Sequence, residues 1–338
     1  MPRIGVNPSR NQTLGYTPPR VTVAVLVYAP HQAGYFQHRL DVTRLTIESI
    51  LANTEQPHEL LVFDNGSCPE MVSFLQGLYG QGKIDQLVLS ARNIGKLNAL
   101  YRIAQLACGG VIAYTDDDVY HLPGWLPAHL EVLDTFPNVG AVTGFYIRQR
   151  VVMSSDTTLK YAEESVESVE RGLLMPHRWE EEYMDNSGRT EERYQSEVAG
   201  IQDVVVTCKG IRAWVSAHHF QMLTPKAVLL SVLEDMLPDG WSDQLMGRMV
   251  EMDDRMDQKG YLRLTTYRQT MRLLGNVIDP EVVELAKKDG IQTQAVESPA
   301  QPKTGLVGKI TRNQHVRNGI QGLINHLYSL LHQNGREE

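Results

Sequence analysis

The chain has 338 residues, 42% of them hydrophobic, which is typical of a globular protein with one large core or one core plus a smaller lobe. Its formal net charge is -8 and it has no pronounced basic stripe, so nucleic acid is excluded as the expected partner, because phosphate backbones bind clustered Lys and Arg. Its three cysteines, Cys68, Cys108 and Cys208, are too few for a disulfide framework or a four-ligand zinc site.

Residues 1–20 are rich in Pro, Gly, Asn and Arg, and they lack the apolar stretch of a signal peptide. The longest apolar run, Val21–Ala29, has about half the length needed to span a bilayer, and it is more typical of a buried strand. We therefore expect a cytoplasmic protein, possible contact with a membrane surface being left to the C-terminal tail.

From Val21 to about Gly144, short apolar runs alternate with longer amphipathic segments, a pattern that predicts an α/β fold with a parallel sheet covered by helices. The expected strands of this half are Val21–Tyr28, Glu59–Phe63, Gln86–Leu89 and Val111–Tyr114. Apolar residues at helical spacing predict two helices, over Arg39–Asn53 and Leu97–Ala107. Two more extended segments follow later in the chain, Val204–Cys208 and Gly260–Thr266.

Three consecutive carboxylates end one of these strands, in Val111-Ile-Ala-Tyr-Thr-Asp-Asp-Asp-Val119. The carboxyl ends of parallel strands form the edge where open α/β sheets bind ligands. Like charges there need a counter-charge, which a divalent cation or a polar ligand would supply; an exposed acidic turn is the alternative. Alternation along an extended strand end puts Asp116 and Asp118 on one side and Asp117 on the other, so we expect Asp116 and Asp118 to act as a pair.

Two further elements follow neighbouring strands. Asp64-Asn-Gly-Ser67 is a tight turn in which Gly66 permits an unusual backbone angle, although an ordinary Asx turn has the same residues. Arg92-Asn-Ile-Gly-Lys-Leu-Asn98 sets two cations and two amides at a strand-to-helix junction. Such a junction can hold a diphosphate, the alternative being an ordinary capped helix start.

In this order, the three elements resemble the nucleotide-binding half of family 2 glycosyltransferases. The matching segments are the first strand, Ser49-Ile-Leu51, Asp64-Asn-Gly-Ser67, Asn93-Ile-Gly95 with Asn98-Ala99, and Asp116-Asp-Asp118. The likeness covers residues 21–276, with its specific part in the first half. It implies a GT-A fold, a mixed and mostly parallel sheet flanked by helices, with a C-terminal helical appendage. It also implies transfer of a sugar from a nucleotide diphosphate donor to an acceptor hydroxyl, with inversion.

The resemblance assigns roles to single residues. Asp64 matches the carboxylate that hydrogen-bonds the nucleobase, and Tyr28 would lie near that base. Asp116 matches the residue near the ribose and the metal, and Asp118 matches the direct ligand of a Mn²⁺ or Mg²⁺ ion that bridges the diphosphate. The stretch near the diphosphate is matched by Arg92, Asn93 and Lys96.

In this family a carboxylate of the acceptor half acts as general base on the acceptor hydroxyl. Asp243 is the predicted base, because Pro238-Asp-Gly-Trp-Ser-Asp-Gln244 resembles the family's loop for base and acceptor contacts. The loop is expected to enter an apolar helix over Leu245–Val250. Asp235 and Asp239 are the alternatives for the base.

One position departs from the family pattern. In Met271-Arg-Leu-Leu-Gly-Asn276 the family has a metal-binding His where this chain has Leu273. Metal binding is then weaker, or another group such as His218 or His219 substitutes; a histidine pair without a metal is the alternative.

Other classes share part of this pattern. A phosphohydrolase of the haloacid dehalogenase type has Asp-x-Asp on its first strand, whereas at least three strand candidates precede it here. A sugar nucleotidyltransferase needs a Gly-rich loop with Arg after its first strand, which Val27-Tyr-Ala-Pro-His31 lacks. A catalytically silent nucleotide-sugar-binding protein stays open, and the missing His favours it. The motifs leave open the donor's sugar and base, and whether the acceptor is a saccharide, a lipid-linked molecule or a small molecule.

The predicted organisation is an extension (1–20), a nucleotide-sugar-binding half (21–145), an acceptor-binding half (146–276) and an appendage (277–338). Residues 160–197 form an acidic insertion, expected to be a solvated face or, alternatively, a mobile flap. In the appendage, Ile320–Leu331 has helical apolar spacing in a locally basic stretch. We expect this helix to dock on the catalytic lobe or to form a homo-oligomer, adsorption to an anionic membrane being the alternative.

Overall fold

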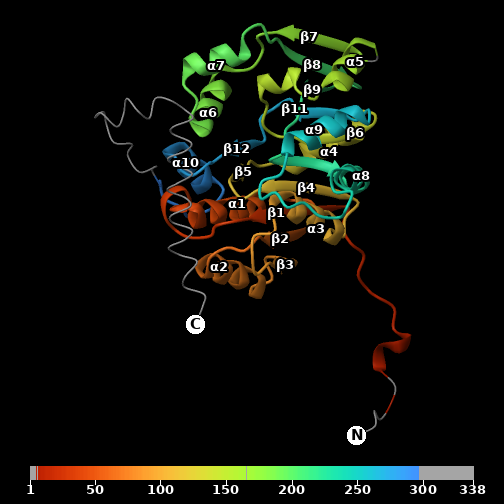
Figure 1. Cartoon of the computed structure of the whole chain (residues 1–338), viewed down its shortest axis with the longest axis vertical. Coiled ribbons are helices and arrows are strands. Elements are labelled where there is room, and N and C mark those ends of the chain that lie inside the picture. The colour runs from red at the N-terminus through yellow and green to blue at the C-terminus, as the bar shows by residue number, and fades with distance from the viewer. Residues whose placement is uncertain (1–4, 6, 165, 297–338) are drawn as a thin grey trace.

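The computed structural model describes residues 5, 7–164 and 166–296. This part of the chain forms a 10-stranded sheet with helices on its faces, in the order β3-β2-β1-β4-β10-β6-β11-β9-β8-β7 (Figure 1). The strands of this sheet are β1 (Val21–Val27), β2 (His58–Asp64), β3 (Gln86–Leu89), β4 (Val111–Asp116), β6 (Val139–Thr143), β7 (Ser168–Gly172), β8 (Asp203–Cys208), β9 (Ile211–Val215), β10 (Gln221–Pro225) and β11 (Leu262–Thr266). A separate small sheet pairs β12 (Met271–Leu273) with β5 (Val119–His121).

The helices are α1 (Arg39–Asn53), α2 (Pro69–Gly80), α3 (Lys96–Leu106), α4 (Trp125–Thr135), α5 (Asp156–Glu164), α6 (His177–Ser187), α7 (Glu191–Val198), α8 (Lys226–Met236), α9 (Met249–Gln258) and α10 (Pro280–Lys288). Short 3₁₀ turns add η1 (Pro8–Asn11), η2 (Gly34–Phe36) and η3 (Arg148–Val152). The pairing directions make β10, β9 and β7 run opposite to the other strands of the large sheet. The expected mixed, mostly parallel α/β fold is confirmed.

The parallel block β3-β2-β1-β4 brings the predicted site residues to one edge. β1 is buried along its whole length, as expected for a central strand of β-branched residues. In its register, Val27 pairs with Asp64 of β2 and Leu26 pairs with Asp116 of β4. The two carboxylates therefore lie on either side of the carboxyl end of β1.

Two hydrophobic layers cover the sheet. One contains Ile47 and Ile50 of α1 with Met71 and Leu75 of α2, and the other contains Leu100 of α3 with parts of α8 and α9. A third, smaller cluster packs α10 against α1 and β5 through Val42, Tyr120 and Val282. Figure 1 shows α10 beside α1, although the two helices are far apart in the sequence. The polar segment after Asn276 thus contains a helix that the sequence analysis did not predict.

The other elements compare as follows. The predicted helix Arg39–Asn53 coincides with α1, and the expected strands match β1 to β4, β8 and β11 within a few residues. The helix predicted over Leu245–Val250 is wrong: residues 241–248 are a loop, and α9 begins at Met249. The apolar residues of this segment, Leu245 and Met246, are exposed, so they gave a false helical signal.

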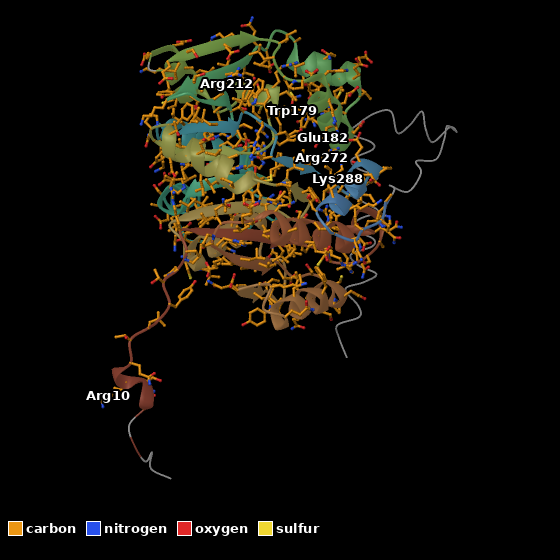
Figure 2. All side chains as sticks on the ribbon, turned by 180° about the vertical axis from the view of Figure 1, so that it is seen from behind. Arg10, Trp179, Glu182, Arg212, Arg272 and Lys288 are labelled. Atoms are coloured by element: carbon orange, nitrogen blue, oxygen red, sulfur yellow. The ribbon has the colours of Figure 1, made fainter. Side chains whose placement is uncertain are left out.

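The acidic insertion is not simply a solvated face. It contains β7, α6 and α7, and two of its glutamates, Glu180 and Glu182, are buried. Glu180 pairs with Arg148, and Glu182 Oε1 lies 3.3 Å from Arg272 Nε (Figure 2). Arginines from outside the insertion neutralise these side chains, which a local charge count cannot detect.

The predicted helix Ile320–Leu331 lies outside the described residues. Within the described part of the chain, no helix is long and apolar enough to cross a membrane. The division of the chain near residue 145 stays a prediction, and one sheet runs through both halves.

Candidate active site

The first wall of the candidate site is the turn after β2. Asp64 is buried, and its carboxylate accepts hydrogen bonds from the backbone amides of Gly66 (3.3 Å) and Ser67 (3.2 Å). Gly66 has φ +85°, and a Cβ there would lie 2.5 Å from the carbonyl carbon of Arg92. Only glycine therefore lets this turn lie so close to the segment after β3.

Side-chain amides connect this turn to the second wall. Asn65 Nδ2 donates to Asn93 Oδ1 (3.0 Å), and the amide of Ile94 donates to Asn65 Oδ1 (2.9 Å). Asn93 Oδ1 also accepts from the amide of Gly95 (2.8 Å), immediately before α3. The Arg92–Lys96 stretch is thus held against the Asp64 turn, with the Arg92 side chain exposed at its start.

The third wall is the acidic end of β4. Lys96 Nζ donates to Asp116 Oδ2 at 2.6 Å, and the Tyr114 hydroxyl donates to Asp116 Oδ1 at the same distance. Burial and the neighbouring Asp116 raise the pKa of Tyr114 well above its ordinary value, so the phenol stays a donor. The structure therefore joins three predicted elements, through Asp64, Lys96 and Asp116.

Strand alternation does not extend beyond Asp116, because β4 ends there. Asp117 and Asp118 instead converge on Arg39 of α1, whose Nη1 lies 3.1 Å from Asp117 Oδ1 and 3.0 Å from Asp118 Oδ2. Arg39 Nη2 also donates to Asn276 Oδ1 at 2.6 Å. The prediction that Asp117 and Asp118 lie on opposite sides of the strand end is therefore wrong, because both carboxylates contact the same guanidinium.

Asp117 is a structural carboxylate. It is buried, and its Oδ2 accepts from the backbone amide of Tyr28 (3.3 Å) and from Thr43 Oγ1 (3.2 Å). Burial raises the pKa of Asp117 to about 6 although Arg39 opposes the shift, and burial also raises the pKa of Asp118. These hydrogen bonds hold Tyr28 beside the acidic edge, where its half-buried ring meets Phe36 edge-on at 5.7 Å.

Arg39 is the site residue that sequence reasoning missed. The expected counter-charge for the acidic run was a divalent cation or a polar ligand, whereas Arg39 and Lys96 supply two cations from the chain. The signal was a polar stripe at helical spacing along α1, and each of its members contacts residues 117–121. The stripe consists of Arg39, Thr43, Thr46, Ser49 and Asn53.

The donor atoms nevertheless suit a hard divalent cation. Asp116 and Asp118 are partly exposed and offer carboxylate oxygens, and Mg²⁺ is commonly bound by one or two carboxylates plus substrate phosphates. Among the described residues, no group of three or more His, Cys, Asp or Glu side chains could hold a metal. The chain by itself therefore offers a partial ligand set, which phosphate oxygens and water would complete.

The departure at position 273 lies next to this set. Leu273 pairs with Val119 in the small sheet, and the amide of Leu274 donates to the carbonyl of Asp118 at 2.8 Å. Substitution by His218 or His219 for the absent histidine stays a prediction. His218 is buried with Nε2 at 2.9 Å from the carbonyl of Phe145, and His219 Nδ1 lies 2.8 Å from Asp253 Oδ2.

The loop that carries Asp243 crosses the start of α3. Asn98 exchanges two hydrogen bonds with the backbone of Ser242, at 2.7 and 2.9 Å, and the amide of Lys96 donates to the carbonyl of Leu245 at 2.7 Å. Asp243 itself is exposed. Of the two alternatives, Asp235 lies on α8, and its Oδ2 is 2.7 Å from Lys259 Nζ in an exposed pair. Asp239 is exposed. The loop thus lies beside the candidate diphosphate stretch.

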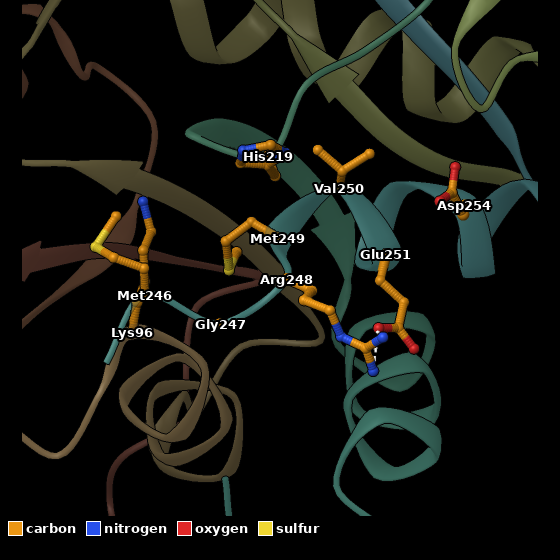
Figure 3. Close-up of a pocket in the computed structure, with 9 residues that line it drawn as sticks. All are labelled: Lys96, His219, Met246, Gly247, Arg248, Met249, Val250, Glu251 and Asp254. Carbon is orange, nitrogen blue, oxygen red and sulfur yellow. Dashed lines mark ion pairs between the residues drawn. The ribbon is translucent and has the colours of Figure 1, made fainter. Parts of the chain in front are cut away.

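A cavity of about 630 Å³ opens beside this loop, lined by Lys96 of α3 and by residues of α9 (Figure 3). Its lining residues are Lys96, His219, Met246, Gly247, Arg248, Met249, Val250, Glu251 and Asp254. Since Lys96 comes from the first half of the chain and the remaining residues from the second, the cavity joins the two halves.

Comparisons with known proteins identify the family of the chain. A family model described as Glycosyl transferase family 2 matches residues 36–213. The "Glucosyl-dolichyl phosphate glucuronosyltransferase" of Haloferax volcanii is 30% identical over 127 residues, which are 37% of this chain and 37% of that protein. The match therefore spans little more than a third of the relative's length.

Solved structures that match part of this chain include "Mannosyltransferase PcManGT from Pyrobaculum calidifontis in complex with GDP-Man and Mn2+". It is 24% identical with a TM-score of 0.32, and the match covers 42% of this chain and 41% of that one. S. aureus TarS 1–349 in complex with UDP is 14% identical with a TM-score of 0.41, covering 83% and 68% of the two chains.

Proposed function

The chain belongs to glycosyl transferase family 2. We propose that it is a nucleotide-sugar-dependent glycosyltransferase that transfers the sugar to an acceptor hydroxyl with inversion and with help from a divalent cation. The observation that carries the proposal is the convergence of Asp64, Lys96 and Asp116 around the carboxyl end of β1. Open α/β sheets bind ligands at this edge.

The donor's nucleoside would lie at the first wall. We assign the nucleobase contact to Asp64, with the ring of Tyr28 nearby, and the ribose contact to Asp116. The diphosphate would lie along Arg92, Asn93 and Lys96, because cations and amides at a helix start suit phosphate oxygens; Arg92 is exposed, and Asn93 and Lys96 are half-buried.

The proposed cation is Mn²⁺ or Mg²⁺, held by Asp116 and Asp118 together with diphosphate oxygens. When bound, it would stabilise the negative charge on the leaving diphosphate. Lys96 and Arg39 would hold these two carboxylates in place before the donor binds, since each already pairs with one of them.

The acceptor hydroxyl needs a base as its oxygen attacks the anomeric carbon. On the basis of its loop, Asp243 is the proposed base, and the two hydrogen bonds between Asn98 and Ser242 support a loop that is fixed beside the donor site. Asp243→Asn should lower the transfer rate about a hundredfold or more at nearly constant donor affinity. Retained transfer in this variant would move the role to Asp235 or Asp239.

The acceptor class remains a proposal. The Haloferax relative is named as a glucosyl-dolichyl phosphate glucuronosyltransferase, and this name favours a lipid-linked acceptor over a saccharide or a small molecule. A cytoplasmic location, contact with a membrane surface and a homo-oligomer through Ile320–Leu331 stay predictions.

A panel of UDP-, GDP- and other nucleotide sugars tests the proposal, each added with and without Mn²⁺ or Mg²⁺. A true donor should raise the melting temperature more with metal than without it, because a ligand of the native state stabilises by mass action. Released nucleoside diphosphate then reports turnover. Binding without any turnover would favour the silent nucleotide-sugar-binding protein, and no binding by any member of the panel would refute the proposal.

A further inference from the structure

The cavity of about 630 Å³ extends the candidate active site toward the second half of the chain (Figure 3). At one end lies Lys96, whose Nζ pairs with Asp116. His219 forms part of the wall between Lys96 and Asp254 in this view. The backbone amide of Asp116 donates to the carbonyl of Phe220 at 2.8 Å, so His219 is next to a residue bonded directly to the acidic edge.

The charged groups of the cavity wall already have protein partners. Lys96 pairs with Asp116, Arg248 Nη2 lies 2.8 Å from Glu251 Oε2, and Asp254 accepts from Ser154 Oγ. The two cations and two carboxylates of the lining also balance each other in charge. This balance favours a neutral ligand group in the cavity.

His219 is held in one orientation from behind. Its Nδ1 lies 2.8 Å from Oδ2 of Asp253, whose side chain is only 2% exposed. Arg263 Nη2 lies 2.7 Å from Asp253 Oδ1, and Arg150 Nη1 lies 3.5 Å from Asp253 Oδ2. Burial alone would raise the pKa of Asp253, but Arg263, His219 and Arg150 outweigh it and lower the pKa, so the carboxylate is ionised.

An ionised Asp253 fixes the hydrogen of the neutral imidazole on Nδ1, which leaves Nε2 with a lone pair. No hydrogen bond from any residue that the structure describes reaches His219 Nε2, and the ring is part of the cavity wall. His219 Nε2 is therefore one of the accepting atoms left for a ligand in the lining; Asp254 Oδ2 is another, because Ser154 reaches only Oδ1 of that carboxylate. A hydroxyl group is the neutral donor that suits His219 Nε2.

Apolar side chains complete the wall. Met246, Met249 and Val250 line the cavity, and Met246 is 70% exposed although its neighbour Gly247 packs on α3. A sugar ring combines hydroxyl groups with an apolar face, and it matches one accepting nitrogen among methionine and valine side chains.

We propose that His219 Nε2 accepts a hydrogen bond from a sugar hydroxyl of a substrate bound in this cavity. Asp253 and Arg263 act as positioning residues that hold the ring with Nδ1 on the buried carboxylate. The proposal rests on the proposed function and leaves the base role with Asp243. The hydroxyl belongs either to the acceptor or to the sugar being transferred, and the test distinguishes these two sources.

The test compares the wild-type protein with His219→Ala, using the nucleotide sugar identified by the donor panel and its nucleoside diphosphate. Affinities for both are measured by calorimetry, and transfer is measured to methyl glycosides of glucose, galactose, mannose and N-acetylglucosamine. If the hydroxyl belongs to the acceptor (the acceptor arm), His219→Ala should lower kcat/KM for the acceptor about tenfold, mainly through KM. If the hydroxyl belongs to the transferred sugar (the donor arm), affinity for the nucleotide sugar should fall about tenfold.

In either arm the affinity for the nucleoside diphosphate alone should not change. His219→Gln should recover part of the loss, because its amide oxygen can accept the same hydrogen bond. His58→Gln is the matched control, since His58 lies at the amino end of β2, about 20 Å from Asp64 along the strand. This control should behave as the wild type in both arms.

The proposal is overturned if neither arm changes in His219→Ala. It is also overturned if affinity for the nucleoside diphosphate falls by the same factor as affinity for the nucleotide sugar, because His219 would then support the donor site in general. Should His219→Ala not fold, the comparison of His219→Gln with Asp253→Asn decides: both must weaken the same arm. A wild-type protein that binds no nucleotide sugar would instead refute the proposed function.

Discussion

Each half of the molecule buries an arginine between two acidic side chains, and the two clusters differ in access. Arg39 holds Asp117 and Asp118 at the carboxyl edge of the sheet, where the Asp118 side chain is 27% exposed. Arg148 holds Glu180 and Asp203 in the second half, where the Asp203 side chain has no exposed surface. Similar residues thus form an open cluster in one half and a closed cluster in the other.

The closed cluster has few hydrogen-bonding positions left. Asp203 accepts two bonds from Arg148 (2.8 and 2.9 Å), one from the Tyr146 hydroxyl (2.9 Å), and two from the amides of Leu174 and Met175 (2.7 and 2.8 Å). In the open cluster, Asp118 receives one side-chain hydrogen bond from the described residues, that from Arg39. The comparison teaches that a fully satisfied carboxylate stabilises the fold, whereas a partly satisfied one at a sheet edge can take a ligand.

Removing the cation of the closed cluster should give the largest effect. Arg148→Met leaves Asp203 and Glu180 buried without their counter-charge, which costs about 3–5 kcal/mol of unfolding free energy. Chemical denaturation measures the loss, with Arg178→Met on the exposed pair with Glu281 as control. A loss below about 1 kcal/mol would show that the tyrosine and the two amides suffice for Asp203.

Neutralising the open cluster should spare the fold and remove function. Asp118→Asn leaves Arg39 with Asp117 and Asn276, so the melting temperature should change little. Metal-dependent donor binding should be abolished, with at least about a hundredfold loss of transfer, equivalent to about 2.7 kcal/mol. Calorimetry with nucleotide sugar in the presence of Mn²⁺ measures this. Unchanged donor affinity would refute the role of Asp118.

Asp64 should give a smaller and more selective effect, since its proposed partner is the nucleobase and not the metal. Asp64→Ala should weaken nucleotide binding by about 1–2 kcal/mol, or roughly five- to thirtyfold, at the same metal dependence. Because Asp64 also accepts from the amides of Gly66 and Ser67, Asp64→Asn is the control for the turn. Equal losses for every nucleotide and for the metal would count against a base contact.

The sequence predicted the strand-end carboxylates of the candidate active site better than the closed cluster, for a physical reason. Asp64 and Asp116 end strands, and the ends of parallel strands meet at one edge whatever the rest of the fold does. Arg148, Glu180 and Asp203 come from segments without a shared period, and only the tertiary structure brings them together. A run of glutamates therefore looked solvated although Glu180 and Glu182 are buried.

Two features of the candidate active site were not predicted from the sequence. Arg39 was assigned only to a helix, because an arginine at a helix start has many explanations; the stripe that continues through Thr43 and Thr46 carried the information. Asp243 was predicted from its loop, but the helix expected after it is absent and α9 begins at Met249. A short run of apolar residues does not distinguish a helix from a loop that exposes Leu245 and Met246 beside a cavity.

A third kind of buried group lies between the clusters, and it gives the smallest prediction. His129 of α4 is fully buried, with Nδ1 at 2.7 Å from the carbonyl of Trp125 and Nε2 at 3.3 Å from Gln221 Nε2. Burial lowers the pKa of His129 to about 4, although these hydrogen bonds oppose the shift. The unfolded chain therefore binds more protons than the native protein between pH 4 and 6.5, and stability must fall as the pH is lowered through this window.

Between pH 7 and 6 the loss of unfolding free energy from this histidine is about 0.7 kcal/mol, and it steepens toward about 1.4 kcal/mol per pH unit below that. Denaturation of the wild type and of His129→Gln over this range should give curves that converge as the pH falls. Parallel curves would mean that His129 titrates alike in both states, and that burial does not keep it neutral.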